Sequence, residues 1–174
     1  TTTTYNAFHP LIEKGPTGEK IAYSYDYAGR KSSVELQGKR STTYVYDAKS
    51  RVIRERCQLD TEGFIGKRYK YNELGQLTYE SYRDHKERVK SYKEYGYDVE
   101  GNKKSIKQEI GGKRTVSRTT YLPNGLPAIH KDTEGNKTSY AYDFHYINKY
   151  GQTVRKKSTK DAKGTTHEEV YDTR

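Results

Sequence analysis

The feature that most constrains the fold of this chain is a short motif, Tyr-x-Tyr followed by Asp or Asn, that returns at nearly regular intervals. Clear copies begin at Tyr23, Tyr44, Tyr69, Tyr95 and Tyr140. When the second tyrosine is the reference and weaker copies are included, the spacing is about 20 to 26 residues. Repetition at such a period is typical of an array of small supersecondary units that contact only their neighbours.

Within each unit, the residue types predict a β-hairpin. Two tyrosines at positions i and i+2 lie on the same face of a strand. The Asp side chain then accepts hydrogen bonds from backbone N–H groups of a turn, and a glycine three residues later takes the positive-φ position that closes it. A second series of turns is expected at residues 15–18, 60–63, 111–112, 132–135 and 161–164. The predicted structural residues of the repeats are Tyr23, Tyr25, Asp26, Gly29, Tyr44, Tyr46, Asp47, Tyr69, Tyr71, Asn72, Gly75, Tyr95, Tyr97, Asp98, Gly101, Tyr140, Tyr142 and Asp143.

Composition opposes a globular fold, but the tyrosines favour a sheet. Leu, Ile, Val and Phe make up only 26 of the 174 residues and the net charge is +10, a combination typical of disordered chains. Disordered chains are poor in aromatic residues, however, whereas this chain has 19 tyrosines placed periodically. Each phenol combines a large apolar ring with a hydroxyl that can reach water, so a thin sheet can form with few aliphatic residues.

Two segments depart from the simple pattern. Residues 82–94 are charged and poor in turn residues, which is compatible with a short helical turn or with a long hairpin, and we favour the hairpin. Between Tyr142 and Gly151 the spacing is about five residues longer than in the other units. Either residues 144–148 bulge out of the strand, or Ile147 replaces Tyr142 as the residue before the turn.

These patterns predict an all-β fold, an array of β-hairpin repeats that forms a curved or spiralling antiparallel sheet. Residues 1–174 are expected to form a single array of about seven units that is truncated at both ends. One unit buries too little surface to be stable alone, so neighbouring units must pair edge to edge.

The motif Tyr-x-Tyr-Asp-x-x-Gly-Arg at residues 23–30 resembles the YD repeat of the Rhs family. That family includes bacterial Rhs polymorphic toxins, the C component of insecticidal Tc toxins, wall-associated proteins of Gram-positive bacteria and the teneurins. The resemblance extends over the whole chain. It implies a long sheet that spirals into a hollow shell, which in the bacterial toxins encloses a C-terminal effector, and it implies a structural role for the paired tyrosines and turn residues.

The chain departs from the family in two ways. Family shells need many more repeats to close, so the chain would form only a sector of an Rhs-type shell. Family toxins end the shell at a self-cleavage site with an Asp-Pro-x-Gly-Leu type of motif. The segment most similar to it is Leu122-Pro123-Asn124-Gly125-Leu126, which lacks the Asp and lies inside the array. We therefore expect no self-cleavage here.

Candidate catalytic and metal-binding residues are sparse. The five histidines lie in different units, and the single cysteine, Cys57, has no histidine near it in the sequence. The motifs His-Glu-x-x-His and Cys-x-x-Cys do not occur, and neither does a Gly-rich phosphate loop. Two Asp-Thr-Glu-Gly segments carry paired carboxylates, but they fall at turns, where Asp has a structural role. We therefore expect no enzyme, no cofactor and no metal site. The histidines are His9, His85, His130, His145 and His167, and the paired carboxylates are Asp60, Glu62, Asp132 and Glu134.

Binding is the remaining class of function. Unpaired tyrosines are the best candidates for exposed, ligand-facing side chains, since the paired tyrosines are needed for packing. The densest basic cluster is short, and 23 acidic residues dilute the positive charge, which argues against a nucleic-acid partner. No apolar segment is long enough to cross a membrane as a helix. The unpaired tyrosines are Tyr27, Tyr79, Tyr82, Tyr92 and Tyr150, and the basic cluster is Arg155, Lys156, Lys157, Lys160 and Lys163.

Two functions follow from the sequence. The first is a non-enzymatic structural sector of an Rhs/YD-repeat shell that encapsulates or scaffolds a secreted toxin or a bacterial surface protein. Its partners would be further YD repeats of the same protein or complex and an enclosed effector domain. The alternative is a free-standing cell-surface module that binds glycans or anionic polymers through rows of Tyr, Lys and Arg.

Overall fold

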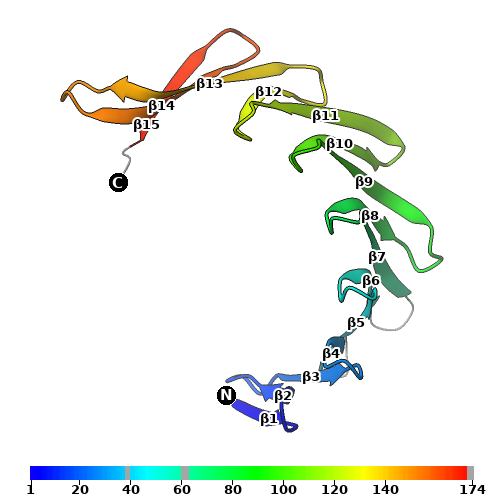
Figure 1. The fold of residues 1–174 in the computed structure, drawn as a ribbon. Helices are drawn as coiled ribbons and strands as arrows, with labels where there is room; N and C mark the ends of the chain where they lie inside the picture. The colour runs from blue at the N-terminus through cyan, green and yellow to red at the C-terminus, as the bar shows by residue number, and fades with distance from the viewer. Residues whose placement is uncertain (38–39, 60–62, 172–174) are drawn as a thin grey trace. The chain divides into compact units, whose positions relative to one another are not determined.

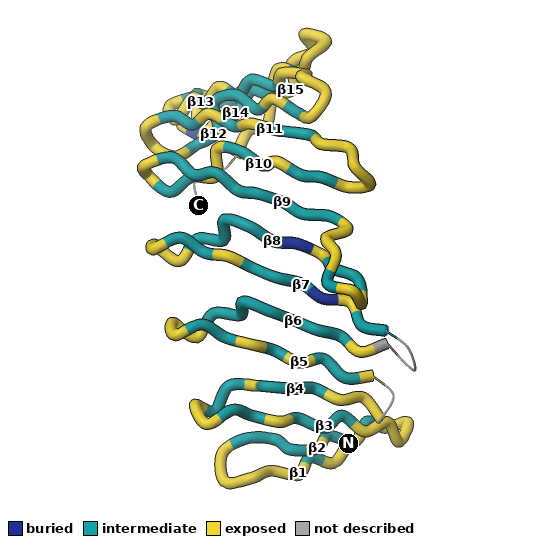
Figure 2. Tube along the Cα trace, turned by 90° about the vertical axis from the view of Figure 1, so that its right-hand side faces the viewer, coloured by how far each residue is buried: buried dark blue, intermediate teal, exposed yellow. Residues whose placement is uncertain are grey.

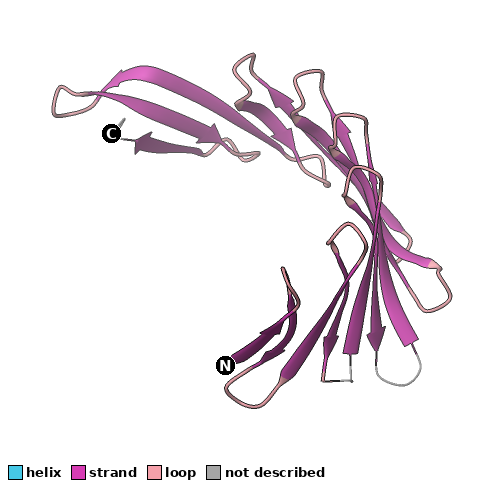
Figure 3. Ribbon diagram, turned by 60° about the horizontal axis from the view of Figure 1, so that its bottom comes forward, coloured by secondary structure: helices cyan, strands magenta, loops and turns pink. Residues whose placement is uncertain are grey.

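The computed structural model describes residues 1–37, 40–59 and 63–171, and over these residues the regular secondary structure is entirely β (Figure 1, Figure 3). The strands belong to one sheet, their order in the sheet is their order in the chain, and successive strands run antiparallel. The prediction of an all-β array of hairpins is thus confirmed. The strands are β1 Thr2–Tyr5, β2 Pro10–Lys14, β3 Lys20–Tyr25, β4 Lys31–Leu36, β5 Arg40–Tyr46, β6 Val52–Leu59, β7 Gly63–Tyr71, β8 Leu77–Arg83, β9 Val89–Tyr97, β10 Lys103–Ile110, β11 Lys113–Tyr121, β12 Pro127–Lys131, β13 Lys137–Ile147, β14 Thr153–Lys160 and β15 Thr166–Tyr171.

The contacts within the chain divide it into two compact units. Unit 1 is Thr1–Lys93 and contains β1 to β8 with the first part of β9, whereas unit 2 is Glu94–Arg174 and contains the rest of β9 with β10 to β15. In both units each hairpin closed by a Tyr-x-Tyr turn is followed by a hairpin closed by a turn of the second series. The two series of turns therefore lie at opposite ends of the strands.

Neither unit has a conventional hydrophobic core. Among the described residues, Val154 is the only apolar side chain that is buried, and Ser81 is the only polar one. Most strand residues are half-buried, because the sheet has a single layer and both faces meet solvent (Figure 2). Burial of apolar surface, the main stabilising contribution in globular domains, is thus limited here, and contacts between neighbouring strands must supply more of the stability.

The Tyr-x-Tyr turns share one geometry. In the turn after β3, the Asp26 N–H donates to the Arg30 carbonyl at 2.8 Å, and the Gly29 N–H donates to the Asp26 carbonyl at 2.9 Å. Gly29 has a φ of 76°, as predicted for the position that closes the hairpin. In the turn after β5, Ser50 takes the same place with a φ of 60°. The pairing register shifts next to Tyr25, Tyr46 and Tyr71, so the second tyrosine of these copies lies at a β-bulge directly before the turn.

The charged segment of residues 82–94 forms the hairpin that we favoured from the sequence. Strand β8 ends at Arg83, and β9 begins at Val89. In the turn between them the Asp84 N–H donates to the Arg88 carbonyl at 3.1 Å. The Gly position of this turn is occupied by Glu87, whose φ is 61°. Residues other than glycine are uncommon in this conformation, and Glu87 shares it in unit 1 with Gln37 and Ser50.

The prediction that Asp143 opens a turn is wrong. Strand β13 continues from Lys137 to Ile147, and the pairing with β14 shifts between Asp143 and Tyr146. The turn begins instead at Asn148, whose N–H donates to the Gln152 carbonyl at 3.0 Å. The physical reason is that an irregularity inside the strand absorbs the additional residues, so that Ile147 takes the place before the turn.

Gly18 allows a direct test of the turn geometry. This residue has a φ of 86°, and a Cβ atom placed on it would meet nothing within 4 Å, so Gly18→Ala introduces conformational strain without a clash. We expect the free energy of unfolding to fall by about 1 to 2 kcal/mol, measured by urea denaturation. Gly15→Ala in the same turn is the control, because Gly15 does not have a positive φ, and an equal loss for both variants would contradict the assignment.

Candidate functional site

The first element of the candidate site is the carboxylate that opens each turn. Asp47 Oδ1 accepts the N–H groups of Lys49 at 2.9 Å and Arg51 at 3.0 Å, and its Oδ2 accepts the Arg51 Nε–H at 2.7 Å. The hydrogen bonds from Arg51 hold the pKa of Asp47 below its usual value. Asp26 is held in the same way by Ala28 and Arg30, as expected from the sequence.

The second element is a row of tyrosine hydroxyls that connects one hairpin to the preceding one. In unit 1, Tyr25 donates its hydroxyl proton to the carbonyl of Pro10 at 2.9 Å. The same bond recurs from Tyr46 to Lys31 at 2.7 Å and from Tyr71 to Val52 at 2.8 Å, and in unit 2 from Tyr121 to Lys103 at 2.9 Å. Each acceptor lies at or near the start of the strand that follows the preceding Tyr-x-Tyr turn. We call this row the tyrosine ladder.

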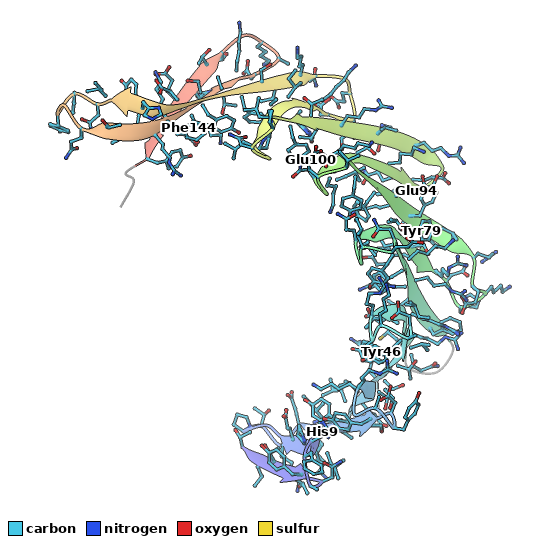
Figure 4. All side chains as sticks on the ribbon, in the orientation of Figure 1. His9, Tyr46, Tyr79, Glu94, Glu100 and Phe144 are labelled. Carbon is cyan, nitrogen blue, oxygen red and sulfur yellow. The ribbon has the colours of Figure 1, made fainter. Side chains whose placement is uncertain are left out.

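The third element is an arginine that extends from one turn to the next. The Arg30 guanidinium lies 4.6 Å from the centre of the Tyr46 ring, and its Nη1 donates to the Asp47 carbonyl at 3.3 Å (Figure 4). The Arg51 guanidinium lies 4.6 Å from the centre of the Tyr71 ring and donates to the Asn72 carbonyl at 3.3 Å. This role was not predicted from the sequence, although the available signal was an arginine four residues after Asp26 and four residues after Asp47.

We call this contact, from the arginine of one turn to the tyrosine ring and the carbonyl of the next, the arginine bridge. Some of the Tyr-x-Tyr turns lack it. In the turn after β7, Asn72 and Gln76 replace the acid and the arginine, and the two amides hydrogen-bond at 2.7 Å. In unit 2, Asn102 donates to Asp98 Oδ2 at 3.1 Å in the corresponding positions. The side chains at the first and fifth positions of these turns therefore remain paired even where the ion pair is lost.

The first tyrosine of each copy has a more varied environment. Tyr23 donates to Glu13 Oε2 at 2.9 Å, and this bond raises the pKa of Tyr23. Tyr69 donates to Glu55 Oε2 at 3.1 Å, and burial together with the Glu55 charge raises the pKa of Tyr69 above its usual range. A lysine ammonium lies over the ring of Tyr23, as Lys31 Nζ is 4.5 Å from the ring centre. The first tyrosines thus combine ring packing with charged partners.

The unpaired tyrosines differ in exposure. Tyr27, Tyr82 and Tyr150 are exposed, as predicted for ligand-facing residues. Tyr79 and Tyr92 are half-buried, and their rings stack on one another at 5.9 Å between centres. Tyr79 and Tyr92 thus use each other as packing partners, and a ligand-facing role for these two residues stays a prediction.

An arginine cluster in unit 1, not anticipated from the sequence, surrounds Glu87. The Glu87 carboxylate accepts hydrogen bonds from Arg56 at 2.7 Å, Arg68 at 2.8 Å and Arg54 at 3.2 Å. Arg83 Nη1 donates to the Glu87 carbonyl at 2.8 Å. The hydrogen bond from Arg56, followed by that from Arg68, holds the pKa of Glu87 below its usual value, although burial acts in the opposite direction. The sequence signal was the Glu in place of Gly in this turn.

The histidines and the cysteine do not gather into a site within the described part of the chain. His9 packs on the Tyr25 ring at 4.6 Å between centres, and His130 Nδ1 lies 3.0 Å from Thr119 Oγ1. The Cys57 thiol is half-buried and contacts the Gln58 carbonyl. Over residues 1–37, 40–59 and 63–171, no group of three or more His, Cys, Asp or Glu side chains could hold a metal ion.

Of the two carboxylate pairs considered from the sequence, the described residues include the pair Asp132 and Glu134, which lies in a turn. Asp132 Oδ1 accepts the N–H groups of Glu134 at 2.9 Å and Asn136 at 2.8 Å, which is the capping role that the sequence suggested. Asp60 and Glu62 lie outside the described residues. The described chain also contains no helix that could span a membrane.

Comparison with solved structures finds similar folds in two much larger chains and in one chain of similar length. The crystal structures of TcdB2-TccC3-Cdc42 and of TcdB2-TccC3-TEV each match with a TM-score of 0.63 at 17% identity. The matches cover 99% and 97% of this chain but only 9% of each of those chains. A porin-like protein from Bacteroides uniformis matches with a TM-score of 0.50 at 10% identity, over 87% of this chain and 88% of that chain. No family model matches the chain, and no curated protein matches it significantly. The likeness to the TcdB2-TccC3 structures supports an Rhs/YD-like β fold, and it concerns the fold alone.

Tyr71 is the best position at which to test the tyrosine ladder. Tyr71→Phe keeps the ring under the Arg51 guanidinium but leaves the Val52 carbonyl without its hydroxyl donor. We expect the free energy of unfolding to fall by about 1 kcal/mol in urea denaturation. The matched control is Tyr27→Phe, because Tyr27 is fully exposed, and a ladder without energetic importance would give the same result for both variants.

Asp26 and Asp47 predict a specific dependence of stability on pH. The pKa of Asp47 is lowered by hydrogen bonds from Arg51; at Asp26, burial raises the pKa but the bonds from Arg30 outweigh it. An Asp in the unfolded chain has a pKa of about 3.9, so the two carboxylate charges stabilise the fold fully above that pH. This contribution is lost as the pH falls through the lower pKa values of the folded state.

We expect a double variant, Asp26→Asn with Asp47→Asn, to be less stable than the unmodified chain at pH 7. The two proteins should converge in stability as the pH falls through the lowered native pKa values of Asp26 and Asp47, since the unmodified chain then loses the two charges as well. Unfolding by urea at a series of pH values measures this. Curves that stay parallel over the whole range would show that the two carboxylates do not act through their charge.

Proposed function

We propose that this chain is a structural, non-enzymatic sector of a larger Rhs/YD-repeat β-shell that encapsulates or scaffolds part of a secreted toxin or bacterial surface protein. The observation that carries the proposal is the tyrosine ladder with its arginine bridges. These contacts join each hairpin to its neighbour and recur in one direction along unit 1, at Tyr25, Tyr46 and Tyr71. They stabilise an extended wall rather than a closed core.

The comparisons support the same proposal. The Tc toxins belong to the family that the repeat motif resembles, and the TcdB2-TccC3 structures contain a segment with this fold. This chain matches about a tenth of their length, 9% of each. Its partners would accordingly be further repeats of the same protein or complex, together with an enclosed effector, and its place of action would be outside the producing cell.

The proposal is tested on the natural polypeptide that contains this chain. We expect native mass spectrometry to give a mass far above the 20.2 kDa of these residues, either in one chain or in a complex with other repeat segments. Within that assembly we expect a segment that limited proteolysis does not reach. A ladder variant that combines Tyr25→Phe, Tyr46→Phe and Tyr71→Phe should expose this segment to cleavage.

The control for this experiment is Tyr27→Phe, which should leave the cleavage pattern unchanged, since Tyr27 is exposed. A natural polypeptide of about the size of this chain that is monomeric and well folded would overturn the shell proposal. If no segment is protected, or if the protected segment is cleaved at the same rate in the ladder variant and in the unmodified protein, the encapsulating role is overturned.

One observation favours the alternative of a glycan-binding surface module. Unit 2 has an open hollow of about 360 Å³ in which aromatic rings meet basic side chains. The rings of Tyr142 and Phe144 stack at 6.4 Å between centres, and the Arg155 guanidinium lies 6.0 Å from the centre of the Phe144 ring. Aromatic faces beside cations suit acidic sugars. The hollow is lined by Leu126, Tyr142, Phe144, Arg155, Lys156, Lys157 and Tyr171.

The alternative predicts saturable binding of acidic oligosaccharides to the isolated chain at low salt, measured by isothermal titration calorimetry. Phe144→Ser should abolish it, whereas the control Phe8→Ser should not, because Phe8 is exposed at the first turn of unit 1. Absence of binding at low salt would eliminate this alternative.

A further inference from the structure

The arginine cluster around Glu87 holds more positive charge than its own carboxylate neutralises. Four guanidinium groups, those of Arg54, Arg56, Arg68 and Arg83, bond to the carboxylate or the carbonyl of this one residue. Arginine stays protonated at all physiological pH values, so three positive charges remain in excess. The cluster is only partly shielded from water, since the side chains of Arg54, Arg56 and Arg68 are 36%, 36% and 44% exposed.

Two other acidic side chains of unit 1, Asp84 in the same turn and Asp47 in the turn after β5, already have cationic partners. Asp84 Oδ2 pairs with Arg88 at 2.8 Å and with Lys90 at 3.5 Å. Asp47 Oδ2 pairs with Arg51 at 2.7 Å. The excess charge of the arginine cluster is therefore not cancelled by these carboxylates.

The cluster also contains hydrogen-bond donors without acceptors. Within the described residues, the Nε atoms of Arg56, Arg68 and Arg83 are buried and have no hydrogen-bond partner. The hydroxyl of Ser81, which lies opposite Arg68 in the strand register, is buried without a partner as well. Unpaired buried donors are costly, so an acceptor oxygen placed beside these three arginines would be stabilising.

There is space for such an acceptor next to the cluster. An open cleft of about 650 Å³ in unit 1 is bordered by Arg68 and Arg83 of the cluster, and by two further cations, Arg51 and Lys70. The remaining lining residues are Asp47, Ile53, Tyr69, Tyr71 and Tyr79. The cleft is thus rich in cations and contains one carboxylate, which Arg51 already engages.

We propose that the arginine cluster and this cleft form a binding site for a phosphate group, either as free phosphate or as a phosphate monoester. Its charge of about −1.5 to −2 at neutral pH offsets most of the excess, and its three strong acceptor oxygens match the number of unpaired Nε donors. A carboxylate ligand fits less well, because it carries a single charge and Glu87 already supplies one such group. The planar arginine fork suits phosphate geometry.

The competing explanation is that the arginines serve only to hold the β8–β9 turn over β6 and β7. The two explanations differ in what the removal of the Glu87 charge does. If the cluster is purely structural, Glu87→Gln only weakens the turn. If the cluster is a phosphate site, Glu87→Gln removes an internal competitor and strengthens phosphate binding.

Isothermal titration calorimetry of the chain with inorganic phosphate and with phosphoserine, at low ionic strength, tests the site. We expect one saturable site per chain, at least a tenfold loss of affinity in Arg68→Gln and at least a threefold gain in Glu87→Gln. Arg114→Gln in unit 2 is the matched control, since it removes the same charge from an exposed position and should change the affinity less than twofold. If Arg68→Gln does not fold, Arg54→Gln replaces it, because Arg54 makes the longest of the three bonds to the Glu87 carboxylate.

Tighter binding of phosphoserine would identify a protein-borne phosphate as the ligand, and tighter binding of inorganic phosphate would identify the free ion. Both results support the site. Absence of saturable binding, or equal losses in Arg68→Gln and Arg114→Gln, would overturn the proposal, since binding would then reflect only the overall charge of the chain.

Discussion

The hydrogen bond from a tyrosine hydroxyl to a carbonyl of the preceding hairpin is the interaction on which the rest of this structure depends. In a single-layer sheet with almost no buried apolar side chain, successive hairpins have little to hold them together beyond the strand ladder. At the end of the strands that carries the Tyr-x-Tyr turns, the pairing between one hairpin and the next stops short of the turn, after Ala22 in β3 and after Thr43 in β5. The tyrosine hydroxyl supplies a bond between hairpins at that weak point, and the arginine stacked on the ring supplies a second.

This arrangement explains the unusual composition. A chain with few aliphatic residues and a net charge of +10 should be disordered, but here rings and charges are used together. The Arg51 side chain makes three kinds of contact at once. Its guanidinium forms an ion pair with Asp47 and lies over the Tyr71 ring. It also donates to the Asn72 carbonyl. Arginine and lysine serve as packing surface as much as charge, so a high content of basic residues does not by itself indicate a nucleic-acid partner.

The turn between β8 and β9 departs from the pattern of the Tyr-x-Tyr turns. The Tyr-x-Tyr turns use glycine or serine at the closing position, as at Gly29 and Ser50, and they serve the array. The turn between β8 and β9 uses Glu87 at that position, and its side chain collects three guanidinium groups from β6 and β7. A strained backbone residue with a charged side chain is typical of functional positions. The arginine cluster is therefore a place where unit 1 departs from its repeated pattern of turns.

The sequence by itself determined the local structure: the strands, the turn positions and the capping role of residues such as Asp26 and Asp47. These depend on residues at most four positions apart, whose preferences are visible in the chain. The sequence could not decide the turn at Asn148 over Asp143, because that choice depends on how β13 pairs with β14. It also could not show that Tyr79 stacks on Tyr92, or that Arg54, Arg56 and Arg68 meet at Glu87. These contacts join residues 13 to 33 positions apart, and only the register of neighbouring strands brings them together.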